Sequence, residues 1–206
     1  QRQMCIRDSM KEVDRIRVAG GPGMVVFSPD GRRAFVDSSR TAQLDVIDVQ
    51  TRKVIARVPV VSPFSPNLVV TPDGKEVWLT HKDVGKVSVI DARTFKVLHV
   101  LDTGKVTNHV NAVTTRAGDF IYVTVGGEDV VKVIKRGPQP QIVATIPTGF
   151  TPHGLWPSGD NTRVYVGLED QDAVDVIDTA TNTVIKTIPI GQMPQAVSYT
   201  HLTLPT

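Results

Sequence analysis

The sequence predicts an all-β fold, a β-propeller fragment of about four four-stranded antiparallel blades. Two recurring positions lead to this prediction. A turn glycine recurs at intervals of 43, 44 and 41 residues: Gly31, Gly74, Gly118 and Gly159. An isoleucine recurs at intervals of 43, 44 and 43 residues: Ile47, Ile90, Ile134 and Ile177. Because one propeller blade of four short strands takes about 40–45 residues, four such repeats predict four blades.

Within each repeat the residues predict strands joined by tight turns. Val87 and Val89 alternate with Ser88, which is the period of a strand. Pro-Asp-Gly at 29–31 and 72–74 places proline and aspartate in a bend and glycine where φ is positive. The next turn reads Asp-x-x-Thr, in which both side chains can bond the turn's own backbone: Asp48 and Thr51, Asp91 and Thr94, Asp178 and Thr181.

These features give the expected blade boundaries. We expect four blades, over residues 22–61, 65–103, 108–148 and 152–190. Residues 11–18 are expected to form the outer strand of a preceding blade, so that 10–196 is one propeller fragment. In the third repeat, residues 134–138 (IKRGP) replace the Asp-x-x-Thr turn with a slightly longer one, and we expect the blade to remain intact.

Several segments carry a family resemblance. VVFSPDG, VTPDGKEVWLT, IYVTV, VYVG and the V-I-D-x-x-T turns resemble the YVTN-type β-propeller repeat family, over nearly all of residues 11–196. The resemblance implies a closed ring of about seven blades, of which this chain would be an arc. It also implies an exported bacterial protein, located in the periplasm or on the cell surface.

Both ends of the chain are expected to be non-native. Residues 1–9 and 197–206 can be written in codons as an inverted repeat, and they resemble a translated sequencing-library adapter. Native termini have no physical reason to encode such a pair, so both segments are excluded from the fold prediction. The single cysteine, Cys5, lies in the excluded part. Thiol catalysis, disulfides and cysteine metal ligands are therefore not expected within residues 10–196.

Composition excludes some classes of partner. The 206 residues include 23 Lys and Arg against 21 Asp and Glu, for a formal net charge of +2. The two signs are interspersed, so we expect no basic face for nucleic acid. The sequence holds no apolar run of about 18 residues, so we expect no membrane span. Motifs for nucleotide, zinc or haem binding are also absent from it, and we expect no cofactor.

The sharpest site candidates are two histidines, His109 and His153. They lie 25 and 24 residues before Ile134 and Ile177, which are near-equivalent positions on the innermost strands of adjacent blades. We expect both on the channel-mouth face, defined here as the face with the loops between blades and between second and third strands. Two imidazoles there can bind a ligand, contribute to a metal site or transfer a proton. The alternative is that each bonds neighbouring loop backbone and seals the channel.

Further candidates surround this pair in the predicted fold. Asn108 and Asn111 can orient a ligand from the same strand. His81 can line the same face, although we expect a solvated loop histidine. Phe150, in a loop between blades, can either grip a ligand or pack over the channel rim. Acidic loop clusters follow the second strands of the last two blades, and we expect solvated turns: Glu128, Asp129, Glu169, Asp170 and Asp172.

Two classes of function remain open from the sequence. The first is a non-enzymatic binding or scaffold module that recognises a protein, a peptide or a small molecule on the channel-mouth face. The second is a redox or hydrolytic propeller enzyme with a histidine-lined, metal-binding channel mouth. A surface array of strung propellers is a third, weaker hypothesis. All three depend on analogy with other propellers, because a fold does not specify a function.

Overall fold

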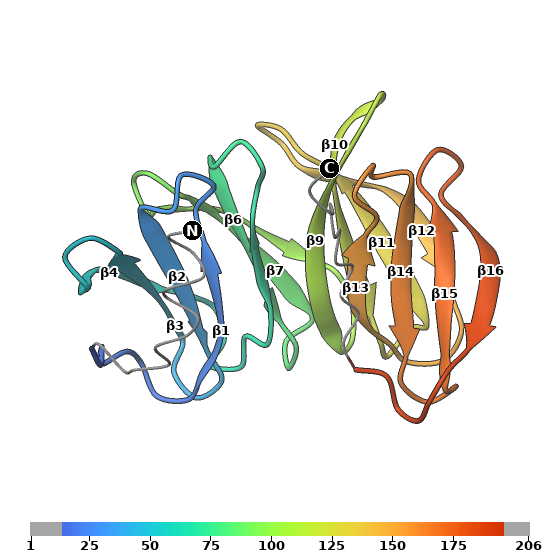
Figure 1. Cartoon of the computed structure of the whole chain (residues 1–206), viewed down its shortest axis with the longest axis horizontal. Coiled ribbons are helices and arrows are strands. Elements are labelled where there is room, and N and C mark those ends of the chain that lie inside the picture. The colour runs from blue at the N-terminus through green and yellow to red at the C-terminus, as the bar shows by residue number, and fades with distance from the viewer. Residues whose placement is uncertain (1–13, 196–206) are drawn as a thin grey trace, which may run out of the picture.

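The computed structural model describes residues 14–195, in which sixteen strands form four sheets (Figure 1). Blade 1 contains β1 (Pro22–Phe27), β2 (Arg33–Ser38), β3 (Gln43–Asp48) and β4 (Lys53–Pro59). Blade 2 contains β5 (Leu68–Val70), β6 (Glu76–His81), β7 (Lys86–Asp91) and β8 (Val97–Asp102). Blade 3 contains β9 (Thr107–Thr115), β10 (Gly118–Val125), β11 (Val130–Lys135) and β12 (Gln141–Pro147). Blade 4 contains β13 (Pro152–Pro157), β14 (Arg163–Leu168), β15 (Ala173–Asp178) and β16 (Thr183–Pro189).

The topology confirms the predicted all-β propeller fragment. Each sheet keeps its strands in chain order, and every neighbouring pair is antiparallel. The first strand of each blade contacts the first strand of the next, which places β1, β5, β9 and β13 innermost. In this part of the chain no helix is long and apolar enough to cross a membrane. The seven-bladed ring stays a prediction.

The core lies between the blades. The second and third strands of a blade are buried almost throughout, as in β2 and β3. In the outermost strand β4, exposed residues alternate with half-buried or buried ones. One cluster joins Phe35 and Leu44 of blade 1 to Leu79 and Ile90 of blade 2. Similar clusters join blade 2 to blade 3 and blade 3 to blade 4. Each sheet is therefore stabilised by apolar surface that its neighbour covers.

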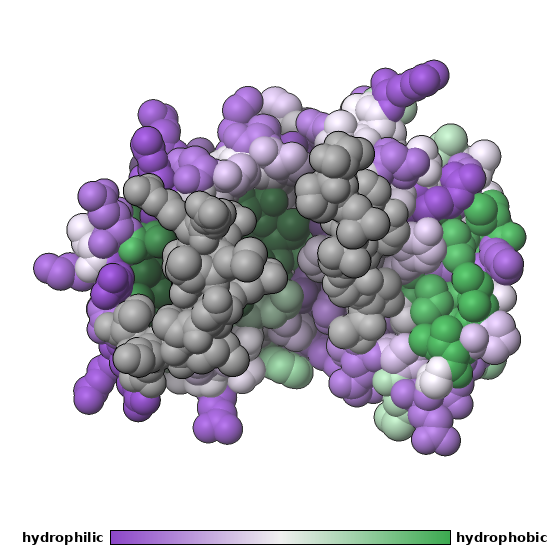
Figure 2. Space-filling model, in the orientation of Figure 1, coloured by the Kyte–Doolittle hydropathy of each residue, from purple (hydrophilic) through white to green (hydrophobic). Residues whose placement is uncertain are grey.

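Several of the apolar side chains that remain exposed lie on an outermost strand. Ile185 and Ile188 of β16 are exposed, and Figure 2 shows an apolar patch on the side of the molecule where β16 lies. The two tryptophans differ, since Trp78 is fully buried and Trp156 of β13 is exposed. Of the expected outer strand 11–18, residues 14–18 form no strand, and 11–13 lie outside the described residues.

The predicted turn chemistry is present. In the first Asp-x-x-Thr turn, Asp48 Oδ1 accepts the Thr51 N–H at 2.7 Å and the Thr51 hydroxyl at 2.8 Å. These bonds hold the pKa of Asp48 below its usual range. The turns at Asp91 and Asp178 repeat the arrangement. The turn glycines Gly31 and Gly74 have φ of 68° and 69°, a conformation that favours glycine.

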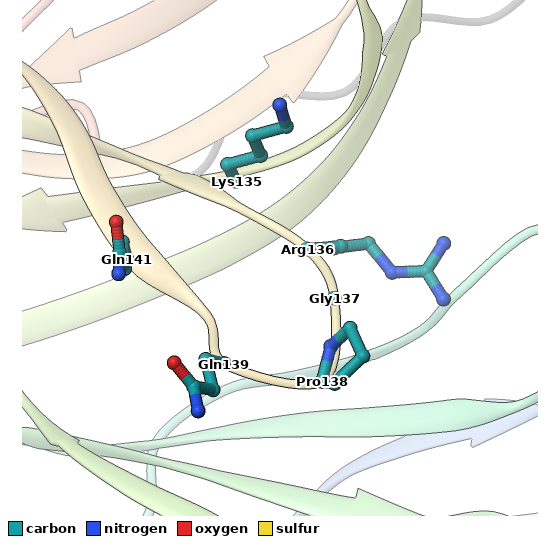
Figure 3. Close-up of a pocket in the computed structure, with 6 residues that line it drawn as sticks. All are labelled: Lys135, Arg136, Gly137, Pro138, Gln139 and Gln141. Atoms are coloured by element: carbon teal, nitrogen blue, oxygen red, sulfur yellow. The ribbon is translucent and has the colours of Figure 1, made fainter.

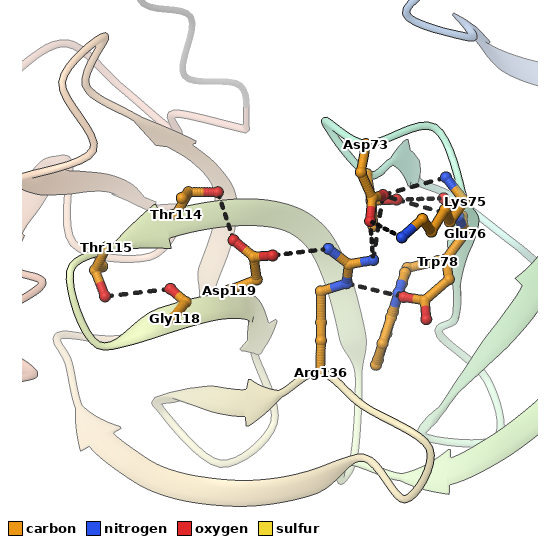
Figure 4. Close-up of polar contacts among 10 residues, drawn as sticks. Asp73, Lys75, Glu76, Trp78, Thr114, Thr115, Gly118, Asp119 and Arg136 are labelled. Carbon is orange, nitrogen blue, oxygen red and sulfur yellow. Dashed lines mark hydrogen bonds and ion pairs between the residues drawn. The ribbon is translucent and has the colours of Figure 1, made fainter.

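The divergent turn of repeat three has a structural explanation. It borders a shallow pocket of about 410 Å³, and its Arg136 points away from the turn (Figure 3). The Arg136 guanidinium bonds Glu76 at 2.9 Å and Asp73 at 3.2 Å in blade 2, and Asp119 at 3.4 Å in blade 3 (Figure 4). Glu76 also accepts the indole N–H of Trp78 at 2.8 Å. The altered turn thus supplies an ion-pair network between two blades.

We expect Arg136→Ala to lower the free energy of unfolding by about 2 kcal/mol, because three carboxylates lose a shared cation that is only 10% exposed. Arg136→Lys should recover less than half of the loss, because one ammonium cannot reproduce the planar guanidinium fork. Urea unfolding measures both changes. The matched control is Arg32→Ala, which removes an ion pair whose partners are 84% and 60% exposed and should cost little. Equal losses from Arg136→Ala and Arg32→Ala would contradict this account.

Candidate functional site

A β-bulge shapes the start of the innermost strand in blades 1, 3 and 4. In each case the register with the second strand shifts, so that two residues of the inner strand oppose one residue of its partner. The bulged residues are 23–24, 108–109 and 153–154, and they lie opposite Asp37, Thr124 and Gly167 respectively. A bulge interrupts the alternation of side chains along a strand, so it re-aims side chains at this rim.

The bulges bring the two predicted histidines together. His109 is the second bulged residue of blade 3 and His153 is the first of blade 4, so their positions differ by one residue in an equivalent bulge. Their ring centroids lie 4.9 Å apart with the planes tilted by 55°. Both side chains are half-buried. The contact spans the boundary between two blades.

Buried threonines fix the backbone beneath the pair. The Thr124 hydroxyl accepts the His109 N–H at 2.9 Å and donates to the His153 carbonyl at 2.6 Å. Thr80, 44 residues earlier, lies at the equivalent position of blade 2. Its hydroxyl lies 2.8 Å from the carbonyl oxygen of Asn108 in the next blade. The Thr124 hydroxyl therefore ties together the two backbone segments that carry the histidines, across the boundary between blades 3 and 4.

Burial keeps both imidazoles neutral at pH 7. Burial, together with the neighbouring His153 and Lys82, lowers the pKa of His109 to about 4. Burial also lowers the pKa of His153, although the Gln195 carbonyl and Glu169 oppose the shift. The Gln195 oxygen lies 2.8 Å from His153 Nδ1, and a carbonyl only accepts, so Nδ1 carries the hydrogen. His153 Nε2 thus keeps a lone pair.

Lys82 is a site residue that the sequence analysis missed. It follows β6 in blade 2, is half-buried, and its positive charge disfavours protonation of both histidines. Its position in the loop between the second and third strands, next to the candidate His81, was the feature of the sequence that could have identified it. Three successive blades therefore contribute to this cluster, which we call the histidine cluster: Lys82, His109 and His153.

The two asparagines contribute differently from what their spacing suggests. Asn108 is buried, and its amide donates to the Pro152 carbonyl at 3.0 Å while its Oδ1 has no partner among the described residues. This bond joins blade 3 to blade 4 beside the histidine pair. Asn111 is half-buried, and its Oδ1 accepts the Ala112 N–H at 2.9 Å. Its described hydrogen bond is therefore local.

The expectation of a solvated His81 is wrong. His81 is the last residue of β6 and is fully buried. Its Nδ1 lies 3.0 Å from the Ser65 hydroxyl and its Nε2 lies 2.7 Å from the Ser88 hydroxyl. Burial lowers its pKa to about 4. The ring is a neutral cross-link within blade 2, and its two serine partners come from segments that only the fold brings together.

The loops around the cluster are tied by acidic residues. Asp129 accepts the Thr151 N–H at 2.8 Å, and Asp172 accepts the Met193 N–H at 2.9 Å. These aspartates thus order the connections between blades. Phe150, in the loop after β12, is 62% exposed. Among residues 14–195 no group of three or more His, Cys, Asp or Glu side chains is arranged to hold a metal ion.

Asp37 takes the threonine position in blade 1. Its Oδ1 accepts the N–H groups of Gly23 at 3.1 Å and Met24 at 2.6 Å. Its Oδ2 is buried and has no hydrogen-bond partner among the described residues. Burial raises the pKa of Asp37 to about 6, although the two N–H groups oppose the shift. The bulge of blade 1 is thus held by a carboxyl group that ionises near neutral pH.

Comparisons with known proteins show the fold alone. No protein-family model and no curated protein matches the chain. Kuenenia stuttgartiensis hydrazine synthase is similar, with a TM-score of 0.77 and 23% identity over 88% of this chain and 52% of that one. The Swd1 β-propeller domain of Myceliophteria thermophila gives 0.75 and 12%, over 88% and 59%. The dihydro-heme d1 dehydrogenase NirN, solved in complex with DHE, gives 0.74 and 19%, over 91% and 41%. The chain therefore spans roughly half of these proteins.

We expect Asp37→Asn to stabilise the protein at pH 7 by about 2 kcal/mol, because it removes a buried charge with an unpartnered oxygen. The folded-state pKa of about 6 lies above the ordinary aspartate pKa of 3.8, which we take for the unfolded chain. The contribution of the protonated carboxyl group is thus complete below pH 3.8 and is lost as pH rises through 6. Urea unfolding at several pH values measures the effect. At pH 3 the two proteins should be equally stable, and equal stability at pH 7 would contradict the prediction.

Proposed function

We propose that this chain belongs to a non-enzymatic binding or scaffold propeller that recognises its ligand on the channel-mouth face. The observation that carries the proposal is the contact between His109 and His153, with ring centroids 4.9 Å apart. Two half-buried imidazoles from adjacent blades thus lie together within the influence of a lysine charge from a third blade. A few converging polar groups of this kind are what fix the orientation of a ligand in a binding site.

The chemistry of the histidine cluster favours a ligand with an acidic group. Lys82 supplies the positive charge and neutral His109 supplies one N–H donor. The N–H of neutral His153 is already bonded to the Gln195 carbonyl, so His153 offers a donor at Nε2 when it is protonated. One nearby acidic group, Glu169, accepts the Gln195 amide at 2.7 Å. A bound carboxylate or phosphate would pair with Lys82 and favour protonation of the imidazoles. Binding should therefore take up protons and strengthen as pH falls from 7 toward 5.

The alternative is a propeller enzyme with a metal at the channel mouth. The observation that favours it is the free lone pair of His153 Nε2 beside the second imidazole. Similar folds include both kinds of protein: hydrazine synthase and a dehydrogenase are enzymes by name, whereas the Swd1 propeller domain is not named as one. Two imidazoles would supply half of a tetrahedral metal site, and other donors would have to complete it.

The location and the repeat family are part of the same proposal. We place the protein among YVTN-like propellers, exported to the periplasm or the cell surface, on the strength of the PDG and V-I-D-x-x-T turns. The partner would be a protein, a peptide or a small molecule that presents an acidic group. This assignment belongs to the whole protein, of which the present chain would carry one segment of the ligand-binding rim.

Isothermal titration of the chain with citrate and, separately, with Zn²⁺ tests the proposal. We expect citrate to bind, and Lys82→Met, His109→Ala and His153→Ala each to weaken it at least roughly tenfold. The three variants should leave the melting temperature nearly unchanged, because the Thr124 and Asn108 bridges remain. Arg32→Ala, which removes a highly exposed cation on a turn of blade 1, is the matched control and should bind citrate normally.

Two results would overturn the binding proposal. Tight Zn²⁺ binding that both histidine variants abolish, without any citrate binding, would favour the metalloenzyme. A large fall in melting temperature with citrate binding retained would show that the histidines only seal the channel.

A further inference from the structure

On the face opposite the channel mouth, the same set of turns meets at each boundary between blades, and we call the space between these turns a groove. Because neighbouring strands are antiparallel, the first-to-second and third-to-fourth strand turns of every blade meet on this face. Each groove is bounded by the first turn of one blade and by both turns of the next. The described residues form three such boundaries between blades, and equivalent residues can be compared among them.

In the first groove an arginine crosses from blade 1 to blade 2. Arg33 donates to the Ala92 carbonyl at 2.8 Å, and its guanidinium carbon lies 4.9 Å from the centre of the Phe95 ring. The space that remains has a volume of about 330 Å³. In the second groove Arg136 reaches back to Asp73 and Glu76, as Figure 4 shows. Both grooves are thus occupied by a guanidinium group.

The third groove differs at one key position. Arg33, Glu76 and Phe120 occupy equivalent positions, each paired with the first residue of the following turn. Phe120 is half-buried and packs on the core between blades 3 and 4. No arginine in the described chain bonds across this boundary, and the Tyr122 hydroxyl instead donates to Asn182 at 2.5 Å. The groove is open, with a volume of about 840 Å³.

The rim of this groove carries both hydrogen-bond donors and hydrogen-bond acceptors, and both positive and negative charges. Asp160 is held anionic by Ser158 and Thr162, which lower its pKa to about 2, and its Oδ2 makes no described hydrogen bond. Arg163 bonds Asp178 through Nη1, so its Nη2 remains available in the described structure. Arg116 and Asn161 complete the rim. An aromatic floor with a balanced polar rim suits a neutral, many-hydroxyl ligand.

We propose that the groove between blades 3 and 4, with Phe120 as its platform, is a binding site for a neutral saccharide. The apolar C–H face of a pyranose packs on an aromatic ring, while its hydroxyls both donate and accept around the rim. The volume lies within the usual range for ligand pockets, about 300–1,000 Å³. Turns border the groove, so no free strand edge is offered to an extended peptide. The site is separate from the histidine cluster and does not depend on it.

The test is titration of the isotope-labelled chain with maltotriose, cellotriose and chitotriose, followed by amide chemical shifts. We expect at least one trisaccharide to bind with millimolar or better affinity and to shift amides in 114–122, 160–163 and 179–182. Phe120→Arg should weaken that binding at least roughly tenfold, because the new guanidinium would fill the groove as Arg33 fills the first. Phe120→Tyr keeps an aromatic face and should keep binding.

The controls separate binding from folding. Phe120→Tyr should retain the wild-type melting temperature within a few degrees. Phe120→Arg loses packing against the core, so its binding is measured at a temperature at which its amide spectrum shows a folded protein. Phe150→Ala on the other face should bind normally. The proposal is overturned if none of the three trisaccharides shifts these amides, or if Phe120→Arg binds as well as Phe120→Tyr. Loss of citrate binding at the histidine cluster would leave this result untouched, so the two proposals fail independently.

Discussion

Packing between the faces of neighbouring sheets is the constraint on which the rest of the structure depends. The two central strands of a blade are buried on both faces, so Phe35 and Leu44 are covered only because blade 2 lies against blade 1. This contact fixes the rotation and height of one blade relative to the next. Polar bridges such as those of Thr80, Thr124 and Arg136 then form at defined places, because their partners are already in position.

The sequence predicted the fold well because the same local interactions recur in successive repeats. Alternating valines, positive-φ glycines and Asp-x-x-Thr turns are local features, and each was readable from a few neighbouring residues. The approach of His109 to His153 was also predictable, since equivalent positions of adjacent blades face one channel. His81 and Lys82 were misjudged or missed because burial and charge proximity depend on segments far apart in the chain. The one-residue offset of the histidines was readable from their spacing to Ile134 and Ile177, but the bulge that contains both positions was not, because a bulge leaves no periodic signal.

The differences among the repeats are more informative than their similarities. Positions that keep the same residue type bond the backbone N–H groups of a turn, as Asp48, Asp91 and Asp178 do. Positions that vary on the same scaffold carry the chemistry. The second bulge position holds Met24 in blade 1 and His109 in blade 3. A constant backbone therefore displays a different surface from each blade, and this is how a repeat fold acquires a distinct site.

The hydroxyl of Thr124 has a mechanical consequence, since it joins the backbones of two repeat units beneath the histidines. In repeat proteins, cooperativity of unfolding depends on coupling between nearest neighbours. A ligand bound by both His109 and His153 would add a second contact across the same boundary between blades 3 and 4. With the ligand bound, blades 3 and 4 would therefore unfold together. Their amides would lose protection from hydrogen exchange in a single event, as one cooperative unit.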